Sequence, residues 1–341
     1  MSDIGKVPAP GKNEIAVKIL AAAINPSDIN MIEGTYGTLP KLPATAGKEC
    51  VARVVAVGAD VKEHTVGDHV VSGSSSFGAW CSEGVAPAAD FLKVTKDLPV
   101  PYAATLHVNP CTAYRMLRDF KQLKPGDVII QNAANSMVGL AVVQMAREMG
   151  VRTINVVRSD RPHAEETLRL LDNLGGTVNV LDTWVNTSGF QEMCRDLPPI
   201  ALALNGVGGP SATELVRALA PGGTMVTYGG MSKKPMEVPT DLVKDRGLKL
   251  EGFWVSQWHE QATAAERTAM LNDISNMIME DKLSFFFEMH DFDDFSHALT
   301  SSMDSFRLRK TVLNMDFGCR LAEHDALPAE AFKRFDAAYD V

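Results

Sequence analysis

The stretch from Pro125 to Pro162 constrains the fold of this chain more than any other part, because it has the pattern of a strand, a helix and a second strand. After a Pro-Gly turn, residues 127–131 form a short run rich in β-branched side chains. Apolar residues then recur at helical spacing until Gly150, and 154–157 is a second apolar run. This unit predicts two parallel strands joined by a helix that covers one face of a sheet.

Small residues fill the turn between the first strand and the helix, from Asn132 to Gly139. Such a turn lets the backbone approach a pyrophosphate at the N-terminus of the helix. The full fingerprint of a dinucleotide site has three glycines, but only Gly139 is in place here, and Met137 stands where a glycine is expected. The turn predicts a dinucleotide site in outline, and a strand–helix–strand unit without a ligand stays open as the alternative.

The end of the second strand indicates which dinucleotide would bind. An acidic residue at this place would bind a ribose 2′-hydroxyl, but the sequence has Arg158, Ser159 and Arg161 instead. Two guanidinium groups and a hydroxyl fit a 2′-phosphate, so the residues favour NADPH. The alternative is that both arginines are simply solvated.

Strands and helices continue to alternate after this unit, which predicts a doubly wound parallel sheet with its ligand crevice at the carboxyl ends of the strands. Helices are predicted over 163–174 and 211–219, and strands over 178–181, 201–205, 224–228 and 248–254. Before the unit, short β runs between 47 and 92 predict a small β-rich domain. Further strands are predicted over 13–20 and 310–313, with helices over 26–34, 111–120, 262–282 and 292–302.

The composition is that of a globular protein with room for two domains, with 341 residues, 45% hydrophobic and 22% charged. A formal net charge of −9 argues against nucleic acid or an anionic membrane as a general partner. No apolar run has the length of a membrane span. The five cysteines include no Cys-x-x-Cys pair, so they provide no zinc framework.

Several separate motifs, in a fixed order, resemble one known family. These are INPSDINMIEGTYG, VNPCTAYRML, QNAANSMVG, RTINVVRSDRP, GGTMVTYGGM and GFWVSQW. Together they resemble the medium-chain dehydrogenase/reductase superfamily and, within its quinone oxidoreductase-like branch, the trans-2-enoyl-CoA or enoyl-acyl-carrier-protein reductases of mitochondrial fatty acid synthesis. The likeness runs from about residue 13 to about residue 314.

The resemblance implies an α/β fold in which a Rossmann domain is inserted into a discontinuous, GroES-like catalytic domain. The expected boundaries are 1–110 and 256–315 for the GroES-like domain, 111–255 for the Rossmann domain, and 316–341 for a C-terminal extension. Phe332, Phe335 and Tyr339 would share one face of a docking helix in that extension.

The resemblance also implies the chemistry, which is hydride transfer from NADPH to the β-carbon of an enoyl thioester and protonation of the α-carbon. The family's proton donor corresponds to Tyr36, within Thr35-Tyr36-Gly37. The family's cofactor positions correspond to Asn109, Asn135, Ser136, Met137, Val138, Arg158, Ser159, Arg161, Tyr228, Gly229, Gly230, Met231, Phe253, Trp254, Val255 and Lys310.

The choice of tyrosine also agrees with physical chemistry. A thioester enolate needs a neutral acid close by, and a phenol can give a proton while it remains uncharged in an apolar site. Without the family, a tyrosine in a surface turn would be the ordinary interpretation of Tyr36.

Some positions depart from the family pattern. The zinc-dependent branch has Gly-His-Glu at the start of its β domain, and this chain has Gly47-Lys48-Glu49, so no metal is expected. Met137 would crowd a pyrophosphate, and the segment from Arg158 to Arg161 is one residue longer than usual. The sequence begins where the family's second strand begins, so we expect the opening strand and the presequence to be missing, through a truncated reading of the gene or in a genuine short form.

Three functions therefore compete at this stage. An NADPH-dependent enoyl thioester reductase, acting on enoyl-CoA or on substrate bound to acyl carrier protein, is favoured by Tyr36. An NADPH-dependent quinone oxidoreductase and an inactive NADPH-binding protein are the alternatives. The resemblance implies the mitochondrion, with the cytoplasm as the alternative. The strand over 248–254, which has apolar residues on both faces, predicts a homodimer that continues the sheet.

Overall fold

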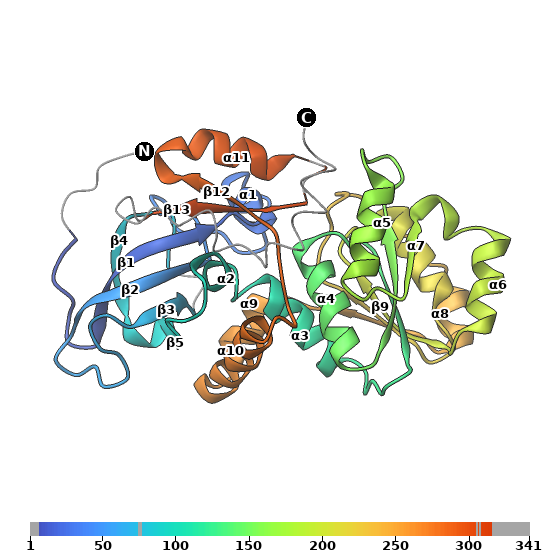
Figure 1. Cartoon of the computed structure of the whole chain (residues 1–341), viewed down its shortest axis with the longest axis horizontal. Helices are drawn as coiled ribbons and strands as arrows, with labels where there is room; N and C mark the ends of the chain where they lie inside the picture. Colours follow the sequence, from blue (N-terminus) through green and yellow to red (C-terminus); the bar gives the residue numbers. More distant parts are fainter. Residues whose placement is uncertain (1–6, 74–76, 305, 307, 316–341) are drawn as a thin grey trace. The chain divides into compact units, whose positions relative to one another are not determined.

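The computed structural model describes residues 7–73, 77–304, 306 and 308–315, so the predicted helix of the C-terminal extension lies outside the described residues. The chain forms two compact units, Met1–Val108 with Ser256–Val341, and Asn109–Val255 (Figure 1). The second unit starts two residues before the predicted boundary at 111, because its first helix already begins at Asn109. Among the described residues, no helix has the length and apolar character that would let it cross a bilayer.

The discontinuous unit is built on a seven-stranded sheet with the order β12-β13-β1-β2-β3-β5, in which β4 also pairs with β1. The strands are β1 (Glu14–Ala23), β2 (Cys50–Val57), β3 (His69–Ser72), β4 (Glu83–Pro87), β5 (Phe91–Val94), β12 (Phe287–Asp291) and β13 (Lys310–Asn314). β13 pairs antiparallel with β1, and Ala22 lies opposite Leu313. The two ends of the chain therefore share one sheet.

Helices α1 (Pro26–Ile32), α2 (Val100–Ala104), α9 (Val255–Gln261), α10 (Ala264–Met279) and α11 (Phe295–Met303) complete this unit, with 3₁₀ turns η1 (Ala88–Asp90) and η3 (Phe292–Asp294). Alternate residues of β1 fill its core. Ile15, Val17 and Ile19 are fully buried and pack with Val54 of β2. The period-2 pattern of β1 therefore places one apolar face toward the core.

The inserted unit, drawn green to yellow in Figure 1, is a six-stranded parallel sheet with the order β11-β10-β9-β6-β7-β8. Its strands are β6 (Val128–Gln131), β7 (Arg152–Val157), β8 (Val178–Leu181), β9 (Ile200–Asn205), β10 (Thr224–Thr227) and β11 (Lys249–Gly252). Its helices are α3 (Asn109–Asp119), α4 (Met137–Glu148), α5 (Ala164–Asn173), α6 (Ser188–Asp196), α7 (Gly209–Ala218) and α8 (Thr240–Arg246), with a 3₁₀ turn η2 (Asp182–Trp184). The predicted doubly wound parallel sheet and the separate β-rich domain are confirmed.

The edge strand β11 differs from its prediction. It has four residues instead of seven, and all four are exposed. Lys249 and Glu251 alternate with Leu250 and Gly252, so the prediction of apolar residues on both faces was wrong. Leu248, the apolar residue that suggested a longer strand, lies before β11 and is buried in the core of the inserted unit.

Candidate functional sites in the two units

The turn that follows α1 fixes the position of Tyr36. The backbone N–H of Asn25, just before the helix, donates to Oδ2 of Asp28 at 2.8 Å, which closes the first turn of α1. After the helix, the backbone N–H groups of Thr35 and Tyr36 both donate to the carbonyl of Asn30, at 2.8 and 3.1 Å. The chain is thus folded back on the helix, and Tyr36 is half-buried.

A buried lysine lies over the ring of Tyr36. Nζ of Lys48 is 3.9 Å from the centre of that ring, and Lys48 is 7% exposed. An ammonium group at this distance is attracted to the face of an aromatic ring, so Lys48 fixes the orientation of the tyrosine. Burial lowers the pKa of Lys48, while Asp28 and Glu260 act in the opposite direction.

Gly47 lets Lys48 reach this place. Its φ of +85° is in the left-handed region, and a Cβ there would lie 2.3 Å from the ring of Trp80. Trp80 is itself fixed, because its indole N–H donates to the carbonyl of Ala23 at 3.1 Å. Glycine is therefore required before Lys48.

Four polar residues form a buried cluster next to this turn, namely Asn25, Asp28, Glu49 and Lys310, all 8% exposed or less. The side-chain amide of Asn25 donates to Oε2 of Glu49 at 2.8 Å, and its Oδ1 accepts from Nζ of Lys310 at 2.6 Å. Nζ of Lys310 also donates to the carbonyl of Ile24 at 2.7 Å. Asn25 is thus the bridge between Glu49, directly before β2, and Lys310 of β13.

Burial changes the acidity of both carboxyl groups in the cluster. It raises the pKa of Glu49 to about 7, although the charge of Lys310 and hydrogen bonds from Asn25 and Val108 act against it. It raises the pKa of Asp28 to about 6, against the N–H of Asn25 and the charges of Lys310 and Lys48. The cluster can therefore take up protons close to neutral pH.

The sequence did not predict this cluster as a unit. A role for Lys310 at the cofactor stays a prediction, and its hydrogen bonds to Ile24 and Asn25 hold the start of β13 to the turn before α1. Asp28 was interpreted only as part of a helix cap. Glu49 gave a weak signal, since a charged residue directly before the apolar run of β2 needs a partner if it is buried.

A cleft of about 810 Å³ opens in the same unit. Its lining includes Met31, the segment from Thr38 to Lys41, Lys48 and Phe77. These residues lie before and after Tyr36 in the sequence. Lys48 both lines the cleft and lies over the ring of Tyr36. A cleft of this volume accommodates a small-molecule ligand.

In the inserted unit, a network of neutral amides holds the carboxyl ends of the strands. The side-chain amide of Asn132, after β6, donates to Oδ1 of Asn205 at 2.9 Å and to Oγ of Ser211 at 3.0 Å. Its Oδ1 accepts from the N–H of Gly206 at 2.8 Å. Oδ1 of Asn205 in turn accepts from the N–H groups of Val207 and Gly208. The turns after β6 and β9 are thus fixed to each other.

The predicted phosphate turn ends in a capped helix. Oγ of Ser136 accepts from the N–H of Gly139 at 3.1 Å, so Ser136 is the N-cap of α4, and Asn135 precedes it. Met137 and Val138 form the first turn of the helix. Gly139 is needed because a Cβ would lie 2.4 Å from the carbonyl oxygen of Ala134. Gly139, the one glycine of the fingerprint that is present, therefore lets the helix pack closely against the backbone of the preceding turn.

The two arginines after β7 have unequal surroundings. Arg158 has an exposed side chain, and its Nε is 3.7 Å from Oδ1 of Asp160. Arg161 is 7% exposed. The N–H of Ser159 between them donates to Oδ1 of Asp182 at 2.9 Å. Arg158 is therefore the more exposed of the two arginines, and Arg161 is the buried one.

The remaining predicted residues follow β10 and β11 or begin α3. Burial raises the pKa of Tyr228 to about 12, against hydrogen bonding with Ser136. A Cβ on Gly206 would lie 2.7 Å from the hydroxyl of Tyr228, so the ring packs on this glycine. Gly229, Gly230 and the exposed Met231 continue the turn after β10, and Phe253, Trp254 and Val255 follow β11. Asn109 begins α3, and its buried Oδ1 has no hydrogen-bond partner in the part of the chain that the structure describes.

Two known families match parts of the chain. Residues 11–95 match the alcohol dehydrogenase GroES-like domain, and residues 138–270 match the family described as zinc-binding dehydrogenase. The mitochondrial enoyl-acyl-carrier-protein reductase of Rattus norvegicus is 46% identical over 304 residues, which is 89% of this chain and 81% of the rat protein. The chain belongs to the enoyl-acyl-carrier-protein reductase family.

Solved structures of related reductases share the fold. The mitochondrial 2-enoyl thioester reductase Etr1p/Etr2p heterodimer from Candida tropicalis matches with a TM-score of 0.81 and 30% identity, over 92% of this chain and 93% of that chain. A complex of Etr1p with NADP and crotonyl-CoA matches with the same TM-score, identity and coverage. This member of the reductase family thus has solved relatives over nearly its whole length.

The name of the second matched family implies zinc, and the residues of this reductase do not fit a zinc ion beside Tyr36. Lys48 stands between Gly47 and Glu49, where the zinc-dependent branch has a histidine. An ammonium group has no lone pair for a metal, and Nζ of Lys48 lies over the ring of Tyr36. We therefore derive no step that involves a metal at this place.

Proposed function

We propose that this chain reduces trans-2-enoyl thioesters with NADPH, and that Tyr36 supplies the proton. The arrangement of Tyr36 beside the buried Lys48, next to the 810 Å³ cleft, is the observation that carries this proposal. Membership of the enoyl-acyl-carrier-protein reductase family supports it. When bound, NADPH supplies the hydride for the β-carbon of the double bond.

The inserted unit is proposed to bind NADPH. The capped N-terminus of α4 offers N–H groups and a positive dipole end to a pyrophosphate. Arg158 and Arg161 bring positive charge to the end of β7, where a 2′-phosphate is expected. The buried Oδ1 of Asn109 is an acceptor that a donor group of the cofactor could satisfy.

Tyr36 is proposed to hold the proton for the α-carbon. Hydride addition at the β-carbon leaves negative charge on the thioester enolate, and the Tyr36 O–H breaks to form the new bond to the α-carbon. The phenolate that results lies next to the ammonium group of Lys48, which stabilises it by attraction of opposite charges until a proton from water restores the phenol.

We place the protein in the mitochondrion, because the rat relative is named as a mitochondrial protein.

We also propose that it forms a homodimer through β11. This strand lies at the edge of the six-stranded sheet and pairs only with β10 among the described strands, and Leu250 is 40% exposed there. A second copy could continue the sheet. Light scattering at micromolar concentration tests the dimer, and an active monomer would rule it out.

The activity is tested by following NADPH oxidation with crotonyl-CoA and, in a parallel reaction, with a quinone. We expect turnover of crotonyl-CoA, and a kcat for Tyr36→Phe that is on the order of a hundredfold lower, with NADPH affinity nearly unchanged. Tyr114→Phe is the matched control, because the guanidinium group of Arg118 lies 3.6 Å from the centre of its ring.

Each outcome distinguishes the competing functions. Turnover of the quinone alone would favour the quinone oxidoreductase, and NADPH binding without turnover of either substrate would favour an inactive binding protein. An unaltered kcat for Tyr36→Phe would remove Tyr36 from the mechanism. An equal loss in Tyr114→Phe would mean that removal of a hydroxyl beside any cation has this effect.

A further inference from the structure

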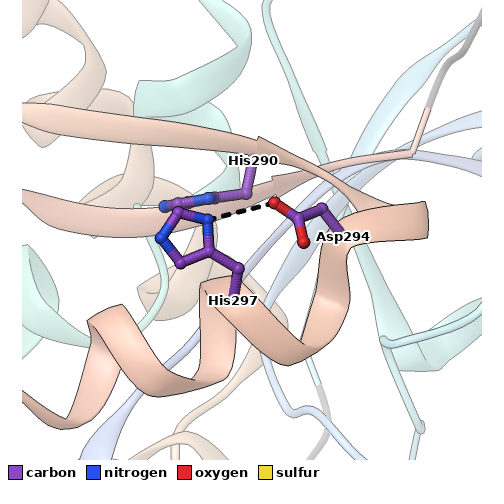
Figure 2. Close-up of side chains that lie close together, drawn as sticks. All are labelled: His290, Asp294 and His297. Atoms are coloured by element: carbon purple, nitrogen blue, oxygen red, sulfur yellow. Dashed lines mark hydrogen bonds and ion pairs between the residues drawn. The ribbon is translucent and has the colours of Figure 1, made fainter.

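A second group of chemically active side chains lies where β12 leads into α11. His290 is on β12, Asp294 ends η3, and His297 is in the first turn of α11 (Figure 2). One ligand atom of each residue can be chosen so that all three lie within 4.8 Å of one another. Nδ1 of His297 is 3.1 Å from Oδ2 of Asp294. Two imidazoles and a carboxylate therefore meet at one point.

His290 is the buried member of this group. Its side chain is 8% exposed, and its buried Nε2 makes no hydrogen bond with the described residues, although it lies 3.2 Å from Oε1 of Glu288. The other oxygen of Glu288 accepts from the hydroxyl of Ser301 at 2.7 Å. A buried imidazole with an unused nitrogen is unfavourable unless a further group satisfies it.

The local fold holds these side chains in place. Asp294 and His297 are three residues apart at the start of a helix, so they share one of its faces. Phe295, between them, packs edge-on against Trp80 at 5.2 Å, and Ala298 is fully buried in the same core. On the other side, β12 pairs with β13, and His290 lies opposite Leu313.

We propose that His290, Asp294 and His297 bind one divalent ion of the zinc type, with Nε2 of His290 as a ligand and Glu288 as a fourth ligand. Imidazole and carboxylate together suit Zn²⁺, whereas Mg²⁺ and Ca²⁺ prefer oxygen ligands alone. The bound ion would link β12 to α11 and stabilise this part of the sheet, separately from the chemistry at Tyr36.

The test uses the full chain without a histidine tag, treated with a chelator and then titrated with Zn²⁺ by calorimetry. We expect one ion per chain and a higher melting temperature with Zn²⁺. Binding should weaken by on the order of tenfold or more in Asp294→Asn and in His297→Gln, both of which change exposed residues. With Co²⁺ as the probe, a visible absorption spectrum of tetrahedral type is expected.

His163→Gln is the matched control. Nδ1 of His163 lies 3.8 Å from Oε1 of Glu166, so an exposed histidine and a half-buried acid are again three residues apart at the start of a helix. No second histidine joins them in the described part of the chain. This variant should bind Zn²⁺ as the natural chain does. Absence of stoichiometric binding, unchanged binding in both site variants, or an equal loss in His163→Gln would overturn the proposal. None of these readouts depends on reductase activity.

Discussion

The two units contain polar sites of opposite character. Around Tyr36, the discontinuous unit buries ionisable groups, with Glu49 fully buried and Asp28 and Lys310 nearly so. At the carboxyl ends of its strands, the inserted unit uses the neutral amides of Asn132 and Asn205 instead. Hydrogen bonds hold both arrangements together, but only the first can change its charge near neutral pH.

The difference follows from what each site is proposed to do. A site that moves a proton benefits from buried groups whose pKa values lie near the working pH. A site that holds a charged cofactor over strand ends benefits from fixed dipoles, which need no change of protonation. We infer that pH acts on this protein chiefly through the discontinuous unit.

The largest expected effect is on the stability of the charged cluster. Glu49→Ala removes the acceptor for Asn25 and for the N–H of Val108 and takes away one of the two acids that compensate the charge of Lys310. Breaking a buried charged pair in this way costs about 3–5 kcal/mol. Denaturant unfolding of the full chain measures it. Glu63→Ala, which changes an exposed glutamate of the same unit, should be within about 0.5 kcal/mol of the natural chain.

A pH series sharpens the comparison further. The pKa of Glu49 is raised from 4.5 to about 7 by burial, so the folded chain holds this proton more tightly than the unfolded chain. Protonation therefore favours folding, and its contribution is fully present below 4.5 and is lost as the pH rises through about 7. Between these two pH values, the unfolding free energy of the natural chain should fall by on the order of 3 kcal/mol more than that of Glu49→Gln.

Asp28 adds to the same trend, because burial raises its pKa to about 6. The slope of the unfolding free energy against pH should stay the same in Asn132→Ala, since an asparagine side chain does not titrate. If Glu49→Gln kept the full slope of the natural chain, the assignment of this pH dependence to the cluster would be wrong.

Cofactor selection should depend on both arginines of the inserted unit, in different ways. Arg158→Ala is expected to weaken NADPH binding by about 1.5–3 kcal/mol and to leave NADH binding unchanged, because a charge-assisted bond to the 2′-phosphate is lost. Arg161→Ala should have the same selective effect and should also lower the melting temperature, since Arg161 is buried. Equal weakening of NADPH and NADH binding would mean that the arginines only hold the fold.

The smallest effect is expected in the amide network. Asn132→Ala leaves Oδ1 of Asn205 and the N–H of Gly206 with fewer partners, which costs about 1–3 kcal/mol. Unfolding of the full chain gives the value, and Asn132→Asp tests the preference for a neutral group, since it keeps the acceptor for Gly206 and adds a charge. If Asn132→Ala lost more unfolding free energy than Glu49→Ala, the amide network would contribute more to stability than the charged cluster, against our expectation.

The sequence predicted the elements of the inserted unit well where the signal was local. The strand over 178–181 has the bounds that were predicted, and α4 ends beside Gly150. It did not predict α6, α8 or β12, whose patterns are short and interrupted by polar residues. β11 was predicted too long because Leu248, a core residue, directly precedes it.

The candidate sites were predicted to an unequal extent. Motif resemblance indicated Tyr36 and the residues at the strand ends. It could not indicate that Lys48 lies over Tyr36, or that Asn25 joins Glu49 to Lys310, because these residues are separated by 12, 24 and 285 positions. Contacts of this range depend on strand pairing and leave no periodic trace in the sequence.

The sequence by itself determined the fold class and the parallel sheet, because these depend on periodicity and on local turn chemistry, and it indicated the family through the resemblance of its motifs. Only the tertiary structure decided which charged residues are buried and which partners they have. The pairing of β13 with β1 puts Lys310 beside the turn at Asn25, and the pairing of β12 with β13 sets His290 next to α11. The physical reason is that burial changes the pKa of an ionisable group and its need for partners, and burial is a property of the packed chain.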